Sequence, residues 1–418
     1  MIERSKDGYE LASVELPKIL LVTDATLSAK GGGINRTLLN LFDQYPYERI
    51  ILFSSRKNIH QYPTISSIKK QTISCETEFV PCLSNRLGKR INPILQVINF
   101  EILKINLLKY IQNIKSFKPQ LLVICPNSIQ FILIGYYLSN HVDCPVVIYA
   151  MDDWIGAEHV RWISGSAKQV IYKLLRKSSA WLLISEQLKN SFSSHYKLMP
   201  KYSMIINNPI DLSDKKLPEF KSFYKGTFKI IYAGSIWPMH YDALATFAQA
   251  VFELRQEGKS IELILHTQES FWSSHKEKWH YWQVSYGRLI PYDRLNKCLQ
   301  SANLLLVVSS FMPDYSFLTR SSFQTKLTDY MASGRPILSV GPDYSVCNQF
   351  LKKWNCGWVC EMNQVSEIKK TLVNIIKNQS QSNDFARRAF AVVQENFEKK
   401  QVQAKLYNFI NYVTHNSI

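Results

Sequence analysis

The sequence predicts an α/β protein made of two successive Rossmann-like units that face each other across a cleft. Short apolar runs, typical of buried parallel strands, alternate with helical stretches along the chain. This pattern breaks in a polar, poorly periodic segment at 211–226 and then restarts. The 418 residues are enough for two domains of about 100–200 residues each. A hydrophobic content of 46% excludes a disordered chain.

The first half opens with a strand, a glycine-rich turn and a helix. An apolar run at 18–23 is followed by three glycines at 31–33, and apolar residues then recur at helical spacing through 34–42. Further strands are expected at 49–54, 120–125, 146–150, 180–185 and 203–206, and long helices at 93–115 and 164–178. This succession predicts a doubly wound sheet.

The second half has the same order of strands and helices. Strands are expected at 228–233, 261–266, 304–308, 336–340 and 358–361. Helices are expected at 242–257 and 325–333, because Gly258 and Gly334 follow them and glycine favours a helix C-terminus. Two more amphipathic helices are expected at 384–396 and 399–413.

Positive charge is concentrated in the first half. The chain has 50 Lys and Arg against 33 Asp and Glu, a net charge of +17. Between residues 51 and 118, eleven basic residues stand against three acidic ones. A second basic cluster alternates with apolar residues and comprises Arg161, Lys168, Lys173, Arg176 and Lys177.

The basic clusters have more than one interpretation. A basic amphipathic helix can lie on an anionic membrane surface. It can equally be a solvated helix face whose other side packs on the core. Nucleic acid is a third partner for a basic protein, but the sequence contains no known DNA- or RNA-binding motif, so we expect no nucleic acid.

Cysteine spacing and apolar runs indicate where the protein resides. The eight cysteines form no Cys-x-x-Cys pair, so we expect neither a metal site nor a disulfide framework. Free cysteines are typical of a reducing compartment, which is where we expect the protein to reside. The first fifteen residues are polar and mixed in charge, so no signal peptide is expected. The longest apolar stretch, 121–138, is interrupted by polar residues and does not predict a membrane span. We expect a cytoplasmic protein, with the inner face of the membrane as a candidate peripheral location.

Two motifs of the first half lie at the carboxyl ends of expected strands, where open α/β sheets bind ligands. Gly31, Gly32 and Gly33 follow the first strand, and a turn without Cβ atoms lets backbone N–H groups approach a phosphate. The alternative is a purely structural turn. Asp152 and Asp153 follow the strand at 146–150, and two adjacent carboxylates there could accept hydrogen bonds from a ligand or act as a base. The alternative is that one of them caps a helix.

Two motifs of the second half also follow strands. The segment Tyr232-Ala-Gly-Ser-Ile-Trp-Pro-Met-His-Tyr241 places Gly234 directly after a strand. The segment Ser321-Ser-Phe-Gln-Thr-Lys-Leu-Thr-Asp-Tyr-Met-Ala-Ser-Gly-Arg-Pro-Ile-Leu338 carries Lys326 at the start of a helix and Asp329 one turn later. Backbone N–H groups and a lysine at a helix start favour an anion. Taken alone, 325–334 is also an ordinary capped helix.

In this order, the motifs resemble those of the retaining family 4 glycosyltransferases, which have the GT-B fold. The segment 204–211, Met-Ile-Ile-Asn-Asn-Pro-Ile-Asp, is similar to the family's exit from the N-terminal domain. The resemblance implies two facing Rossmann-like domains with parallel sheets and a C-terminal crossover helix. The implied domains are 1–211 on the acceptor side, 212–397 for the nucleotide sugar, and 398–418 as a helix that packs back on the N-terminal domain.

The resemblance also implies roles for individual residues. Asp329 matches the family's second glutamate, which binds the ribose hydroxyls, and Ser321 stands in place of the first, which contacts the donor sugar. Ser235 and His240 stand where the family has the Arg and Lys that neutralise the donor diphosphate, so His240 would contribute charge only when protonated. The residues implied for donor binding are Gly32, Gly33, Gly234, Ser235, His240, Arg320, Ser321, Thr325, Lys326 and Asp329. Asp152 and Asp153 are the implied catalytic residues on the acceptor side, and no metal or other cofactor is implied.

The predicted function is that of a retaining glycosyltransferase. It would move a sugar from a nucleotide-diphosphate sugar to a glycan or lipid-linked acceptor, in surface polysaccharide biosynthesis. The base would be recognised by backbone groups around 287–292. Because the usual Arg, Lys and first Glu are absent, a catalytically inactive carbohydrate- or partner-binding protein of the same fold is an alternative. A sugar-nucleotide epimerase of this fold is another.

Overall fold

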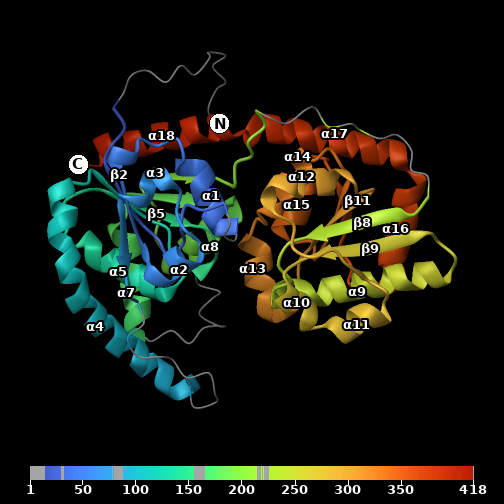
Figure 1. The fold of residues 1–418 in the computed structure, drawn as a ribbon, viewed down its shortest axis with the longest axis horizontal. Coiled ribbons are helices and arrows are strands. Elements are labelled where there is room, and N and C mark those ends of the chain that lie inside the picture. The colour runs from blue at the N-terminus through green and yellow to red at the C-terminus, as the bar shows by residue number, and fades with distance from the viewer. Residues whose placement is uncertain are drawn as a thin grey trace.

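The protein consists of two α/β domains that lie side by side (Figure 1). The computed structural model describes residues 15–29, 33–77, 79, 88–154, 165–213, 218, 220 and 226–417. Each domain is built on one parallel sheet, and the helices α17 and α18 run along the same side of the molecule over both domains.

The N-terminal domain contains a parallel sheet of seven strands among the described residues. The strand order is β3-β2-β1-β4-β5-β6-β7, so the chain reverses its direction of progress between β1 and β4. The strands are β1 Ile19–Val22, β2 Ile50–Ser55, β3 Thr72–Cys75, β4 Leu121–Ile124, β5 Val146–Ala150, β6 Ala180–Leu183 and β7 Tyr202–Ile205. Strands β1, β2, β4, β5 and β6 are buried at every residue, as their continuous apolar sequences require.

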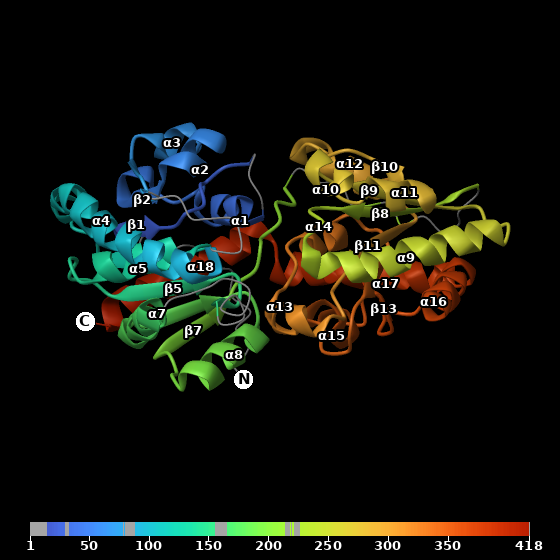
Figure 2. The ribbon, with the colours of Figure 1, turned by 90° about the horizontal axis from the view of Figure 1, so that it is seen from below.

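Helices cover this sheet, and α5 contacts both α4 and α7 on one side of the domain (Figures 1 and 2). The helices are α1 Gly33–Phe42, η1 Tyr47–Arg49, α2 Arg56–Gln61, α3 Ser66–Lys69, α4 Gly88–Phe117, α5 Ile129–Ser139, α7 Gly165–Lys177 and α8 Glu186–Tyr196.

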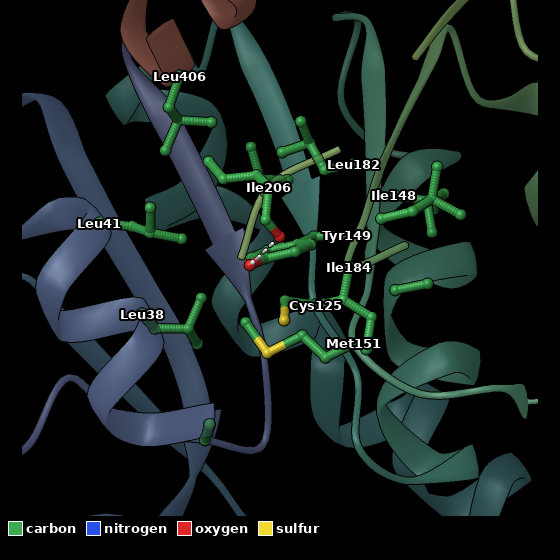
Figure 3. Packing of buried hydrophobic residues seen from close by; sticks show 14 of the residues in the cluster. Leu38, Leu41, Cys125, Ile148, Tyr149, Met151, Leu182, Ile184, Ile206 and Leu406 are labelled. Carbon is green, nitrogen blue, oxygen red and sulfur yellow. Dashed lines mark hydrogen bonds between the residues drawn. The ribbon is translucent and has the colours of Figure 1, made fainter. Parts of the chain in front are cut away.

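The core of the N-terminal domain includes side chains from both ends of the chain. In Figure 3, Leu38 and Leu41 of α1 point toward the sheet, and Leu406 of α18 lies at the top of the same cluster. Tyr149 of β5 is buried and donates through its hydroxyl to the Ile206 carbonyl at 3.5 Å. The C-terminal helix is therefore part of the first domain's core.

The C-terminal domain contains a parallel sheet of six strands within the described part of the chain, in the order β10-β9-β8-β11-β12-β13. The strands are β8 Phe228–Ala233, β9 Ile261–His266, β10 Ser285–Tyr286, β11 Leu304–Val308, β12 Ile337–Val340 and β13 Trp358–Cys360. The helices are α9 Pro238–Gln256, α10 Glu269–Ser273, α11 Lys276–Tyr281, α12 Tyr292–Gln300, η2 Pro313–Tyr315, α13 Ser316–Ser321, α14 Lys326–Ala332, α15 Val346–Lys353, α16 Val365–Lys377, α17 Gln379–Asn396 and α18 Lys399–Asn416.

Two connecting segments pass side by side between the domains. Ile210 pairs with Glu398 in a parallel bridge, and its backbone N–H donates to the Phe397 carbonyl at 2.8 Å. Beyond this point α18 packs against α1, where Tyr407 donates to the Leu41 carbonyl at 3.0 Å. The chain thus returns to the N-terminal domain after completing the C-terminal one.

The strands expected from apolar runs are confirmed, with bounds that differ by no more than two residues at either end. Two strands were missed. β3 is half-exposed along most of its length, and β10 has two residues, so neither produces a long apolar run.

Candidate functional site

The first turn of α1 contacts the start of α14 across the domain boundary. Gly33 begins α1, whereas Gly32 and the glycine before it lie outside the described residues. A Cβ atom at Gly33 would lie 2.8 Å from the Thr325 hydroxyl oxygen, closer than real Cβ contacts come. Asn208, which follows β7, donates to Thr328 Oγ1 at 3.4 Å. The structure therefore brings the turn after β1 and the segment around Thr325 together.

Asp329 is a buried carboxylate that is contacted by one residue from each domain. Arg36 of α1 approaches Asp329 Oδ2 at 3.3 Å, and the Tyr292 hydroxyl of α12 lies 3.5 Å from Oδ1. The Arg36 guanidinium also lies 4.2 Å from the centre of the Tyr292 ring, within the range of a cation–π contact. Partial burial and the Asp329 carboxylate raise the pKa of Tyr292, so its phenol remains a donor. We call these three residues the Arg36–Tyr292–Asp329 cluster.

Lys326 places its ammonium beside the turn after β8. Its Nζ donates to the Tyr232 hydroxyl at 2.6 Å and lies 3.9 Å from the centre of that ring. Gly234 has φ +148°, and a Cβ atom there would be 3.0 Å from Lys326 Nζ. The absence of a side chain at Gly234 is what allows the ammonium to approach the turn. Burial lowers the pKa of Lys326 to about 7.

His240 forms a contact within this turn but carries no positive charge at pH 7. The imidazole is 5% exposed, and its Nδ1 lies 3.1 Å from the Ser235 carbonyl. Burial, together with the neighbouring Lys326, lowers the pKa of His240 to about 3, so the ring is neutral at pH 7. The positive charge considered for His240 is therefore missing. The cation beside Gly234 and Ser235 is Lys326, from an element almost a hundred residues further along the chain.

Arg320 and Ser321, on α13, point in different directions. The exposed Arg320 guanidinium lies 3.8 Å from the centre of the Tyr344 ring. Ser321 is 2% exposed, and its hydroxyl donates to the Phe317 carbonyl of its own helix at 2.8 Å. The Ser321 carbonyl accepts from Ser185 Oγ, after β6, at 2.7 Å. Ser321 thus joins the two domains rather than presenting a carboxylate-like group.

Asp152 and Asp153 follow β5 and have different surroundings. Asp153 is 2% exposed and accepts from Ser191 Oγ of α8 at 2.8 Å. Asp152 is half-buried. Its carboxylate, with that of Asp24, adds to the effect of burial in raising the pKa of the Cys125 thiol. Asp24 and Asp152 thus follow the two strands that flank β4, and each carboxylate acts on the Cys125 thiol.

Three residues of the interdomain contact were missed from the sequence. Arg36 contacts Asp329, and Ser185 contacts the Ser321 carbonyl, across the domain boundary, so no local pattern connects the partners. Tyr292 contacts Asp329 within the C-terminal domain and ends the segment 287–292, which was expected to recognise the base through backbone groups and not through this side chain. The one available signal was a cation in the first turn after the glycine segment. Among the described residues, no three His, Cys, Asp or Glu side chains form a cluster that could hold a metal ion.

Two facing Rossmann-like domains with parallel sheets and a helix that crosses back from the second domain to the first define the GT-B fold. The fold expected from the sequence is therefore confirmed. The sequence matches no protein-family model and no curated protein.

Solved structures of this fold are similar to almost the whole chain. The structure of HepE from Anabaena in complex with UDP and glucose has a TM-score of 0.66 at 14% identity, covering 94% of this chain and 99% of that one. Sucrose-phosphate synthase from Thermosynechococcus elongatus has a TM-score of 0.70 at 11% identity, covering 95% and 99%. The α,α-trehalose 6-phosphate synthase of Burkholderia multivorans has a TM-score of 0.66 at 8% identity, covering 96% and 98%.

Proposed function

We propose that the protein is a retaining glycosyltransferase that uses a nucleotide-diphosphate sugar. The observation that carries the proposal is the position of Lys326 and Asp329, one turn apart on α14, with the Lys326 ammonium against the Gly234 turn. A cation beside a glycine turn suits a diphosphate, and a buried carboxylate suits two vicinal ribose hydroxyls. HepE, which has the same fold, binds UDP.

In the reaction, the bond between the anomeric carbon and the diphosphate breaks, and the acceptor hydroxyl forms a new bond on the same face of the sugar. The acceptor's proton passes to an oxygen of the leaving phosphate. The main catalytic demand is stabilisation of the negative charge that develops on that phosphate. Lys326 would supply it, with Thr325 and the backbone N–H groups that follow Gly234, whose own N–H donates to the His266 carbonyl at 2.9 Å. Arg320 is a second candidate cation.

The N-terminal domain would supply the acceptor side. Asp152 lies at the carboxyl end of β5 and is the more exposed of the two, whereas Asp153 is 2% exposed and accepts from Ser191 Oγ. We therefore assign acceptor contacts to Asp152 and a positioning role to Asp153. Gly33, at the start of α1, would line the opposite wall of the donor phosphates, whereas Gly32 lies outside the described residues. The acceptor is a glycan or a lipid-linked glycan, as in surface polysaccharide biosynthesis, and the basic N-terminal half suits an acceptor at an anionic membrane surface.

A catalytically inactive binding protein is the second candidate. It is favoured by the burial of Ser321, whose hydroxyl is bonded within its own helix and offers the donor sugar no carboxylate. Sugar transfer to an added acceptor pool separates the two functions. An inactive protein binds the nucleotide without turnover.

The direct test is thermal unfolding in the presence of each nucleoside diphosphate. A nucleotide at about 100 times its Kd should stabilise the protein by about 2.7 kcal/mol. Asp329→Asn keeps the shape of the side chain but removes the charge that accepts the ribose hydroxyls, so the shift should disappear. Asp293→Asn, on an exposed carboxylate of α12, is the matched control and should retain it. A shift that survives in Asp329→Asn would refute the assigned nucleotide site.

A further inference from the structure

The outer face of α4 is apolar although it is exposed. Ile105 is 70% exposed, Ile94 60% and Leu108 57%. Six apolar side chains of α4 are exposed: Ile91, Ile94, Val97, Ile98, Ile105 and Leu108. Large apolar side chains gathered on one surface usually mark an interaction site.

These side chains form one stripe along the helix. Positions 91, 94, 98, 105 and 108 are spaced by three, four or seven residues, which places them on one side of an α-helix. The opposite side is also apolar, because Leu103, Leu107 and Ile114 are buried in the domain core. One side of α4 therefore packs on the domain, and the other side has no partner among the residues that the structure describes. We call the exposed side the α4 stripe.

Positive charge surrounds the stripe. Glu101 lies within it but pairs with Lys104, so its charge is neutralised. Lys109 and Lys115 follow on exposed positions of the same helix. α5 lies between α4 and α7 and contacts both (Figure 2). On α7, Lys168, Lys173 and Arg176 are exposed, and the sequence of this helix contains no acidic residue.

We propose that the α4 stripe and the basic face of α7 dock the N-terminal domain onto an anionic lipid bilayer. Within the described residues, no helix combines the length and the apolar composition needed to cross a membrane, so α4 would lie in the interface rather than span it. Apolar side chains would enter the acyl boundary, and the lysines and arginines would contact lipid headgroups.

Charge favours a bilayer over a second copy of the chain. In a symmetric dimer through this face, the basic residues of both copies would approach each other, and like charges across an interface oppose association. An anionic bilayer satisfies both the apolar stripe and its positive border. The inference rests on the membrane part of the proposed function, but not on sugar transfer itself.

The test is cosedimentation of the full-length protein with vesicles of phosphatidylcholine, with and without phosphatidylglycerol. The protein should bind the mixed vesicles at low salt, and binding should weaken as salt is raised. The double variant Ile105→Glu with Leu108→Glu should bind at least about tenfold more weakly, since it places two negative charges in the stripe. Met362→Glu changes an exposed apolar residue of the C-terminal domain and should bind like the unchanged protein.

A second variant examines the basic component. Lys173→Glu with Arg176→Glu should reduce binding to the mixed vesicles while leaving the weak binding to phosphatidylcholine unchanged. The nucleotide-induced thermal shift should be retained in both double variants, which shows that they are folded and that a membrane defect is separate from a donor-site defect.

Two results would overturn the inference. One is equal binding of the unchanged protein and the α4 double variant to anionic vesicles. The other is a concentration-dependent dimer, detected by analytical ultracentrifugation, that Ile105→Glu with Leu108→Glu dissociates, because the stripe would then be covered by a second copy.

Discussion

The protonation state of Lys326 depends on whether an anion lies beside its buried amino group. In the free protein, burial lowers its pKa to about 7, so the ammonium and the neutral amine are nearly equally populated at neutral pH. Its hydrogen-bond partner, the Tyr232 hydroxyl, is neutral, because burial raises the pKa of that phenol well above its usual value. A bound diphosphate would be the missing counter-charge and would raise the lysine's pKa.

We therefore expect nucleoside diphosphate affinity to fall as pH rises above about 7. Below that pH, Lys326 is already protonated and binding takes up no proton. Above it, binding must take up one proton, so the affinity falls by up to about tenfold per pH unit. Calorimetric titrations between about pH 7 and pH 9 measure this. Phosphate, with a second pKa of about 6, is mostly ionised at pH 7 and changes little above it.

The control for this titration is Lys326→Met. It should bind the nucleotide more weakly at pH 7 and should show no dependence on pH over the same range. A slope that persists in Lys326→Met would assign the titration to another group and would contradict the role proposed for Lys326.

At the same scale, the sequence could identify residues by type and spacing but not by partner. Asp329 and Lys326 were singled out because their spacing matched a family pattern. The structure places Asp329 at the domain boundary, beside Arg36, and Lys326 against the Gly234 turn. Arg36 could not be paired with Asp329, because the two are 293 positions apart and no local pattern connects them. His240 was considered as a cation because burial is not visible in a residue type.

At the scale of elements, the first residue of α1, Gly33, lies against Thr325 at the start of α14. Gly33→Ala within a helix would ordinarily stabilise a protein by about 0.5–1 kcal/mol. Here we expect Gly33→Ala to lower the free energy of unfolding, because the new Cβ atom would lie 2.8 Å from Thr325 Oγ1 and would push the two helices apart. Chemical unfolding followed by tryptophan fluorescence measures the change in free energy.

Thr325→Ala provides the matched background. It removes the hydroxyl oxygen and the methyl group, leaving only Thr325 Cβ at 3.6 Å from the new atom. In this background Gly33→Ala should be neutral or stabilising, so the double-mutant cycle should show a coupling of about 0.5–3 kcal/mol. Additive effects of the two changes would mean that the helices do not meet as described.

Elements were predictable in proportion to their burial. β5, β8, β9 and β11 were expected at the residues where they occur. β5 and β11 are unbroken apolar runs, and β8 and β9 are mainly apolar, with Lys229 in β8 and Glu262 and His266 in β9. The start of α9 was expected four residues too late, since Pro238 at its first turn was not taken as a helix start. The apolar outer stripe of α4 could not be told from a buried face, because periodicity does not reveal which side of a helix is covered.

At the scale of the whole molecule, α18 ties the end of the C-terminal domain to the N-terminal domain. Lys399 forms ion pairs with Asp43 of the N-terminal domain and, at 3.7 Å, with Asp211. Gln403 donates to Asp43 Oδ1 at 2.8 Å from the next turn of the helix. We propose on this basis that the domains divide as expected from the sequence, at 211 and 397, with 398–418 belonging structurally to the first.

Lys399→Met should lower the free energy of unfolding by about 1–3 kcal/mol, because it leaves a largely buried carboxylate without its cation. Lys352→Met breaks a more exposed pair with Glu361 and should cost no more than about 1 kcal/mol. Urea unfolding of the two variants measures both values. Equal losses would show that docking of α18 does not depend on this pair.

The return of α18 to α1 has a consequence for biosynthesis. Tyr407 and Leu41 are 366 positions apart, and at about 5–20 residues per second a ribosome needs on the order of tens of seconds to make the intervening chain. Throughout that time the surface of α1 that Leu406 and Tyr407 later cover is without its partner. The domain that is translated first is therefore the last to be completed, and the nascent chain carries an open apolar surface until the final helix leaves the ribosome.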